Sequence, residues 1–173
     1  GRGAVFPPWP RRKYADLFAE CVGISLTDIA AVRARARELG VPEQKLDDEV
    51  VIHSLFDHYV EPTLVNPTFV IDWPAALCPL TKRYPDNPDV ALRFEVFMNG
   101  MEVGNAYSEL NDPEVQRATF SRQLRGEEDE TMAVMDEDFC EALEYGMPPA
   151  GGLGIGMDRV VMLLTGRTSI RDV

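Results

Sequence analysis

The dipeptide Asn99-Gly100 constrains the fold of this chain most, because it separates two runs with the composition of β-strands, residues 92–98 and 101–107. Both positions of a two-residue hairpin loop need positive φ, which asparagine and glycine tolerate. We therefore expect an antiparallel hairpin in which Met98 faces Met101 and Phe97 faces Glu102.

Helical patterns precede and follow this hairpin. Apolar residues spaced three and four apart predict helices over residues 12–22 and 47–60, and a capping residue followed by an Ala- and Arg-rich run predicts one over residues 25–39. Ser25 or Thr27 is expected to cap the helix over residues 25–39. A proline near the first turn indicates another over residues 113–124, and helices are also expected over residues 137–145 and over residues 157–164, after the glycine-rich segment. A β-branched and aromatic run at residues 68–71, bounded by prolines, predicts a buried strand.

These patterns together predict an α+β fold, with a mainly antiparallel sheet flanked by helices. The length of 173 residues fits a single domain over residues 1–173. Within it, residues 1–61 are expected to be mainly helical, and residues 62–173 are expected to contain the sheet.

Charge and composition exclude several classes of function. A formal net charge of −12 argues against a surface built for general nucleic-acid binding, although a local basic site stays open. Nine acidic and no basic residues lie between Glu127 and Glu144, and we interpret this run as a solvated face rather than a metal site.

The three cysteines, Cys21, Cys78 and Cys140, have no paired spacing that would indicate disulfides or a zinc site. No run approaches the ~20 apolar residues of a membrane span, and residues 1–8 lack the apolar core of a signal peptide. The expectation is a soluble cytoplasmic protein.

Two glutamates of the hairpin form a candidate carboxylate site. In the expected register Glu95 and Glu102 are diagonal neighbours on one face, with β-carbons about 7 Å apart. Such a pair can bind Mg²⁺ together with phosphate oxygens, which suits nucleotide chemistry. The alternative is a pair of solvent-facing glutamates on an open sheet.

Asn105, Tyr107 and Glu109 have the opposite parity to Glu102, so a regular strand would place them on the other face. A β-bulge at Gly104 would bring them beside the two glutamates. The combined face would suit a small cationic ligand, with Glu109 pairing with its ammonium group. The alternative places Tyr107 in the core and the other two on the surface.

The glycine-rich segment 152–156 precedes an apolar helix that carries Arg159. Its spacing matches neither G-x-G-x-x-G nor a P-loop. Glycines such as Gly154 and Gly156 let a ligand approach the backbone, and Arg159 could present its guanidinium to a phosphate. Arg159 could equally be structural, paired with Asp158 or a nearby carboxylate.

Taken together, five segments closely resemble the C-terminal part of the catalytic domain of class II lysyl-tRNA synthetases: residues 101–113, 136–139, 142–149, 152–159 and 168–173. The resemblance is nearly continuous from about residue 61 to 173 and looser over residues 7–40. Residues 152–159 resemble motif 3 of the family.

The resemblance implies roles for the same residues. Glu95 and Glu102 would bind Mg²⁺ with ATP, near Gly154 and Gly156, while Arg159 would hold the terminal phosphate and act in catalysis. Asn105, Tyr107 and Glu109 would surround lysine. In the family reaction the lysine carboxylate attacks the α-phosphate of ATP, and a ribose hydroxyl of tRNA(Lys) then takes the lysyl group.

Segments that resemble motif 1, motif 2 or the anticodon-binding domain are not found. We therefore expect a fragment or truncated paralogue of the synthetase, forming a homodimer or associating with a chain that carries motifs 1 and 2. The alternative is a non-catalytic lysine-binding or protein-interaction module. A paralogue that lysylates a protein such as elongation factor P is a weaker hypothesis, because it would still need motif 2.

Overall fold

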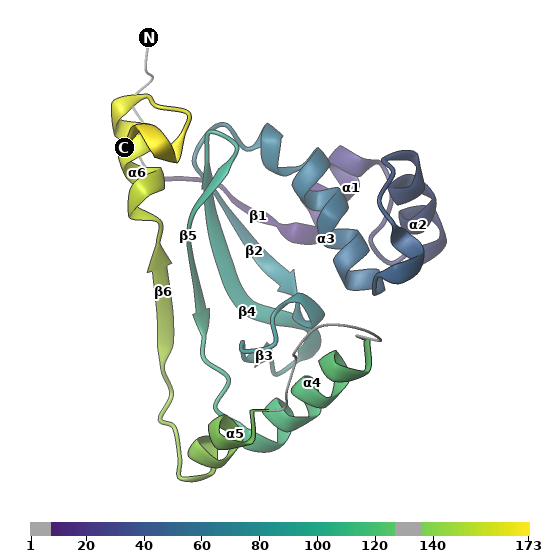
Figure 1. Cartoon of the computed structure of the whole chain (residues 1–173), viewed down its shortest axis with the longest axis vertical. Helices are drawn as coiled ribbons and strands as arrows, with labels where there is room; N and C mark the ends of the chain where they lie inside the picture. Colours follow the sequence, from purple (N-terminus) through teal and green to yellow (C-terminus); the bar gives the residue numbers. More distant parts are fainter. Residues whose placement is uncertain (1–7, 127–135) are drawn as a thin grey trace.

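The computed structural model describes residues 8–126 and 136–173, in which helices surround a twisted sheet (Figure 1). The first part of the chain contains β1 (Arg11–Lys13), α1 (Tyr14–Val22), α2 (Ile29–Glu38) and α3 (Asp48–Tyr59). The strands β2 (Thr68–Pro74), β3 (Arg83–Tyr84), β4 (Asn87–Met98) and β5 (Met101–Ser108) follow. The chain continues through α4 (Pro113–Gly126), α5 (Glu137–Glu144), β6 (Gly151–Ile155) and α6 (Met157–Thr165).

The strands form one sheet in the order β1-β2-β4-β5-β6, with β3 paired to β4. β1 pairs with β2 in parallel, and the other pairings are antiparallel. The predicted α+β class with a mainly antiparallel sheet is therefore confirmed. In the two described ranges, no helix is long and apolar enough to cross a membrane.

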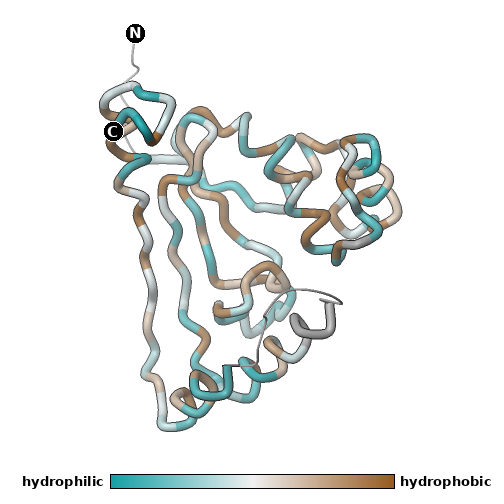
Figure 2. The backbone as a smooth tube through the Cα atoms, viewed as in Figure 1, coloured by the Kyte–Doolittle hydropathy of each residue, from teal (hydrophilic) through white to brown (hydrophobic). Residues whose placement is uncertain are grey.

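The hydrophobic core lies between this sheet and helices α1 and α3. The Tyr14 ring stacks on Phe56 with 4.1 Å between centroids, and Trp73 of β2 lies 4.8 Å from Tyr14. Tyr14, Phe56 and Phe97 are fully buried. Figure 2 shows hydrophobic stretches on these helices and on the strands beside them. This packing fixes the β2–β4 side of the sheet.

Two helix starts differ from the sequence prediction. Arg12 and Lys13, predicted as the start of a helix, belong to β1 instead, because they pair with Val70 and Ile71 of β2. The second helix begins at Ile29, and its cap is Asp28, whose carboxylate accepts a hydrogen bond from the Ala31 N–H at 3.1 Å. The predicted caps, Ser25 and Thr27, instead hydrogen bond to each other at 2.8 Å.

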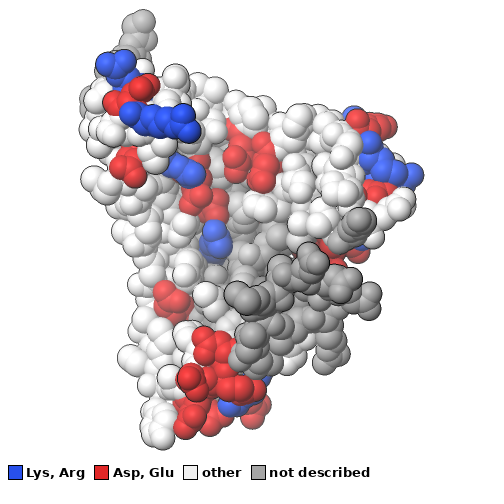
Figure 3. Space-filling view, in the orientation of Figure 1, with Lys and Arg blue, Asp and Glu red and all other residues white. Residues whose placement is uncertain are grey.

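The acidic run is described only from residue 136 onward, and Glu127, Glu128, Asp129 and Glu130 lie outside the described residues. The acidic side chains of α5 and its cap are exposed, as predicted for a solvated face. Arg117 of α4 pairs with Glu137 at 3.3 Å and with Glu144 at 2.5 Å. Figure 3 shows acidic side chains gathered over this end of the molecule.

Candidate ligand-binding site on the β4–β5–β6 face

The hairpin has the predicted register and bulge. Asn99 and Gly100 have φ of 55° and 71°, Met98 pairs with Met101, and Phe97 pairs with Glu102. The next pair joins Val96 to Gly104, so one residue is skipped and the bulge lies immediately before the predicted Gly104.

The bulge reverses the parity of the rest of β5. Asn105 lies opposite Glu95, and Tyr107 lies opposite Arg93. Because paired residues in a sheet share a face, Glu95, Glu102, Asn105 and Tyr107 project from the same side. A Cβ on Gly104 would lie 2.7 Å from the Gly154 carbonyl oxygen, so a glycine is required where β5 meets β6.

Glu95 is the most buried charged side chain of this face. It retains 5% of its accessible surface and forms an ion pair with the Arg93 guanidinium. Burial raises the pKa of Glu95 to about 7, with the neighbouring charges of Glu102 and Glu61 adding to the increase and Arg93 opposing it. With this pKa the Glu95 carboxyl group is only partly ionised near neutral pH, and a further nearby cation would favour its charged form.

Glu102, Asn105 and Arg159 form a second cluster beside it. The Asn105 amide donates to Glu102 Oε1 at 2.8 Å, and Arg159 Nη1 donates to the Glu102 carbonyl oxygen at 2.5 Å. Arg159 Nη1 also lies 3.5 Å from Glu102 Oε2. Arg159 is thus paired with a carboxylate while about half of its side chain stays exposed.

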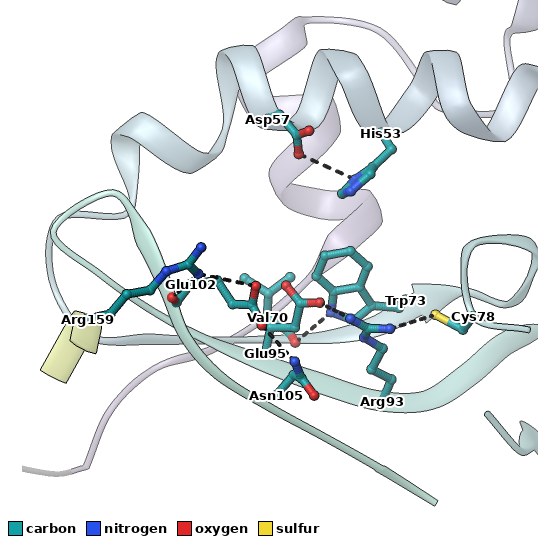
Figure 4. A network of polar contacts seen from close by, with 10 residues as sticks. All are labelled: His53, Asp57, Val70, Trp73, Cys78, Arg93, Glu95, Glu102, Asn105 and Arg159. Atoms are coloured by element: carbon teal, nitrogen blue, oxygen red, sulfur yellow. Dashed lines mark hydrogen bonds and ion pairs between the residues drawn. The ribbon is translucent and has the colours of Figure 1, made fainter. Parts of the chain in front are cut away.

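A pocket of about 290 Å³ lies at this cluster, and its lining includes Glu102, Asn105, Gly154, Gly156 and Arg159. Figure 4 shows Arg159 on one side of the Glu102 and Glu95 carboxylates and Arg93 on the other. In Figure 3, acidic and basic side chains lie side by side in the hollow between the α6 and α3 ends. The structure thus joins five of the predicted site residues around one opening.

Tyr107 of β5 and Glu109, the residue after β5 ends, continue the same face. Both are half-buried, so Tyr107 is not a core residue and Glu109 is not a freely solvated one. The Arg93 guanidinium lies 6.0 Å from the Tyr107 ring centroid. The Glu109 backbone forms a bridge with Thr81, and its carboxylate lies beside Gly152 of β6.

The glycines of β6 make one face of this strand bare. Gly152 pairs with Tyr107 and Gly154 pairs with Asn105, so both glycines lie on the site face. Leu153 and Ile155 have the opposite parity, and their side chains are 69% and 55% exposed. A ligand on the site face would therefore lie next to backbone.

The sequence analysis did not identify Arg93, His53 and Asp57 as neighbours of the carboxylates. Arg93 lies over the Trp73 ring at 5.2 Å and pairs with Glu95. Its position two residues before Glu95 was a usable signal, because residues i and i+2 of a strand share a face. His53 and Asp57 of α3 lie above the carboxylates in Figure 4, and no local pattern in the sequence indicated that approach.

Glu61, just after α3, also belongs to this acidic surrounding. Burial raises the pKa of Glu61 to about 7, and the charges of Asp57 and Glu102 add to the increase. Carboxylates therefore outnumber basic side chains in this hollow, whose basic residues among those described are Arg93 and Arg159. Such a field favours a cationic ligand or a metal-bound phosphate over a free anion.

Residues 8–126 and 136–173 contain no group of three or more histidine, cysteine or acidic side chains arranged to hold a metal by themselves. The pair of Glu95 and Glu102 nevertheless fits Mg²⁺, which takes one or two carboxylates and completes its shell with water and phosphate oxygens.

Comparison with known protein families identifies the family of this chain. The family of class II tRNA synthetases (D, K and N) matches residues 4–173. The chain therefore belongs to the class II tRNA synthetases of this group.

Within the family, the chain is similar to proteins named lysine–tRNA ligase. It is 51% identical over 172 residues to that of Carboxydothermus hydrogenoformans, covering 96% of this chain and 35% of the relative. It is 49% identical over 174 residues to that of Chloroflexus aurantiacus, again covering 96% and 35%. The chain thus spans about a third of the length of these curated relatives, as expected for part of a lysyl-tRNA synthetase.

Proposed function

We propose that this chain forms the part of a lysyl-tRNA synthetase that binds lysine and the metal-bound phosphates of ATP. The observation that carries the proposal is the bulge before Gly104, which brings Glu95, Glu102, Asn105 and Tyr107 onto one face. The lysine–tRNA ligase relatives support the choice of substrate.

The lysine would lie along the β5–β6 part of this face. Glu109 would pair with its ε-ammonium, and the Tyr107 ring and the Asn105 amide would contact its chain and polar groups. The missing side chain at Gly154 gives the ligand room beside the backbone. Because the hollow is negative, a cationic amino acid is favoured over a neutral one of the same shape.

ATP would bind at the other end, around the pocket at Glu102 and Arg159. Glu95 and Glu102 would hold Mg²⁺, which when bound neutralises phosphate charge. Arg159 would give up its contact with Glu102 for the terminal phosphate, and Gly154 and Gly156 leave space for the nucleotide. In the reaction an oxygen of the lysine carboxylate would bond to the α-phosphorus as the bond to pyrophosphate breaks, and the lysyl group of the adenylate would then pass to tRNA(Lys) with release of AMP. Because no segment resembling motif 2 is found, another chain carrying that motif would complete the α-phosphate site.

Calorimetric titration of the purified chain with L-lysine tests the lysine half of the proposal. We expect saturable binding, at least about tenfold weaker binding in Glu109→Gln, the factor for one lost charge-assisted contact, and no comparable binding of L-arginine. Glu141→Gln, which changes an exposed α5 carboxylate that is not among the predicted site residues, is the matched control and should bind lysine like the parent chain.

ATP–pyrophosphate exchange then separates binding from turnover. Exchange that depends on lysine and is lost in Arg159→Ala would support adenylate formation by this chain. Lysine binding without exchange would favour a lysine-binding module that needs another chain for catalysis. Absence of lysine binding at millimolar concentration would contradict the proposed pocket.

A further inference from the structure

Gly152 of β6 lies so close to the Glu109 carboxylate that the structure has no room for a side chain at position 152. A Cβ built on Gly152 would lie closer than 3.0 Å to Glu109 Oε1, a distance that real Cβ atoms essentially never show. The space that a side chain would occupy at position 152 is therefore filled by the Glu109 carboxylate. The same Cβ would lie 3.9 Å from the Tyr107 ring, which is ordinary contact.

The backbone of Glu109 has little freedom to move. Its N–H donates to the Ala150 carbonyl oxygen at 3.0 Å, and the residue also forms a bridge with Thr81. Leu110 N–H donates to the Leu80 carbonyl oxygen at 2.9 Å. Glu109 is thus held between the start of β6 and the segment that contains Leu80 and Thr81.

That segment is in turn fixed by α4. The Gln116 amide, which is fully buried, donates to the Pro79 carbonyl oxygen at 3.2 Å. Lys82 N–H donates to the Ser108 carbonyl oxygen at 2.9 Å. Because the main chain around Glu109 is held on both sides, only the end of its side chain can respond to a change at position 152.

We propose that Gly152 is a positioning residue that sets the place of the Glu109 carboxylate, and through it the length of the cationic amino acid that the pocket accepts. This inference rests on the proposed lysine site. A methyl group at position 152 displaces the carboxylate from β6 without requiring β6 itself to move. The terminal ammonium of the ligand then meets its partner at a different depth, so selectivity between lysine and its one-methylene-shorter analogue ornithine changes.

Gly151 provides the matched control. A Cβ on Gly151 would lie 3.6 Å from the Tyr107 carbonyl oxygen, an ordinary van der Waals contact. Gly151→Ala therefore adds the same methyl group to the same strand without meeting Glu109. Any general effect of alanine on β6 appears in both variants, and displacement of the carboxylate appears only in Gly152→Ala.

The first measurement is the ¹³C resonance of the Glu109 carboxyl group, assigned by its loss in Glu109→Gln. We expect it to shift in Gly152→Ala and to stay in place in Gly151→Ala. An unchanged resonance in Gly152→Ala would overturn the proposal. This readout needs no ligand, so it decides the positioning role even if the chain fails to bind lysine, a result that would count against the proposed function alone.

The second measurement is a double-mutant cycle in lysine and ornithine binding. Gly152→Ala is expected to weaken lysine binding by about tenfold, the effect of losing one charge-assisted hydrogen bond, and to change the lysine-to-ornithine preference. In the Glu109→Ala background, where no carboxylate remains to be displaced, the same substitution should have no further effect. An equal loss in both backgrounds would show that Gly152 acts on β6 as a whole, and would contradict a role through Glu109.

Discussion

The two lateral halves of the sheet, called here the β2–β4 side and the β6–α6 side, are covered to different extents. On the β2–β4 side, α1 and α3 cover the strands, and Tyr14 and Phe56 have no exposed surface. On the β6–α6 side, Leu153 and Met157 are 69% and 63% exposed, although they are just as apolar. Figure 1 shows the helices α1 to α3 gathered on one side, with β6 and α6 at the opposite edge.

The site lies between these two sides, and its residues divide accordingly. Glu95, on β4, is buried and held by Arg93, whereas Arg159, on α6, is half exposed. The covered side therefore supplies Glu95, a buried carboxylate held in place by Arg93. The open side supplies space for a ligand and Arg159, whose exposed guanidinium can exchange Glu102 for a phosphate. Substitutions on the covered side should cost stability, and those on the open side should cost binding.

The largest expected effect is loss of core packing. Phe56→Ala removes a fully buried ring that contacts Tyr14, Trp73 and Phe97, and we expect it to lower the free energy of unfolding by about 4 kcal/mol. Leu153→Ala, on the open edge, should cost less than about 0.5 kcal/mol because its side chain is mostly exposed. Urea denaturation followed by circular dichroism measures both. Similar losses in the two variants would remove the distinction between the sides.

The buried ion pair gives the next largest effect. Arg93→Met leaves the Glu95 carboxylate buried without its partner, and should lower the free energy of unfolding by about 3 kcal/mol. Arg35 also lies over an aromatic ring, Tyr59 at 6.0 Å, but its pairing with Glu38 is exposed. Arg35→Met should cost less than about 1 kcal/mol. Equal midpoints in urea for these two variants would contradict a special role of burial at Arg93.

The hairpin shows how far local sequence determined the structure. Asn99-Gly100 indicated the turn and the register of its first two pairs, and Gly104 indicated the bulge, because each residue meets a conformational or steric requirement set by its own neighbourhood. The helices were predicted with most of their lengths, from apolar spacing together with capping residues, terminal glycines and a proline near a first turn. Arg12 and Lys13 were assigned wrongly to a helix because their strand depends on a partner almost sixty residues away.

The candidate site likewise has one part that local sequence predicted and another that depends on tertiary packing. The face shared by Glu95, Glu102, Asn105 and Tyr107 could be predicted, because parity and one bulge determine it. The approach of Glu61 could not, because it depends on how α3 packs across the sheet rather than on strand parity. The role of Arg159 was left open between binding a phosphate and pairing with Asp158 or a nearby carboxylate, and in the structure its guanidinium lies beside Glu102.

A substitution at Gly104 tests the contact between β5 and β6, where the covered and open sides of the sheet meet. Gly104→Ala brings a Cβ within 2.7 Å of the Gly154 carbonyl oxygen, so β5 and β6 must separate locally, at a cost of about 2 kcal/mol. Lysine binding should be lost more completely than stability, because Asn105 and Gly154 no longer lie side by side. Gly151→Ala, which makes only ordinary contact, should retain both properties. Comparison of lysine binding by calorimetry with the urea midpoints shows whether the contact between β5 and β6 affects binding more than stability.

The smallest expected effect is on the pH dependence of stability. The pKa of Glu61 rises to about 7 in the folded protein, mainly through burial and then through Asp57 and Glu102, against about 4.3 for an unperturbed glutamate. The folded state therefore binds this proton more tightly, so its contribution to stability is full below about pH 4.3 and is lost as the pH rises toward 7. Glu61→Gln should flatten the fall in Tm between pH 5 and 7.5, whereas Glu141→Gln, on the exposed face of α5, should leave the slope unchanged. Parallel Tm curves for the parent chain and Glu61→Gln would mean that the carboxylates of the hollow are better solvated than their burial indicates.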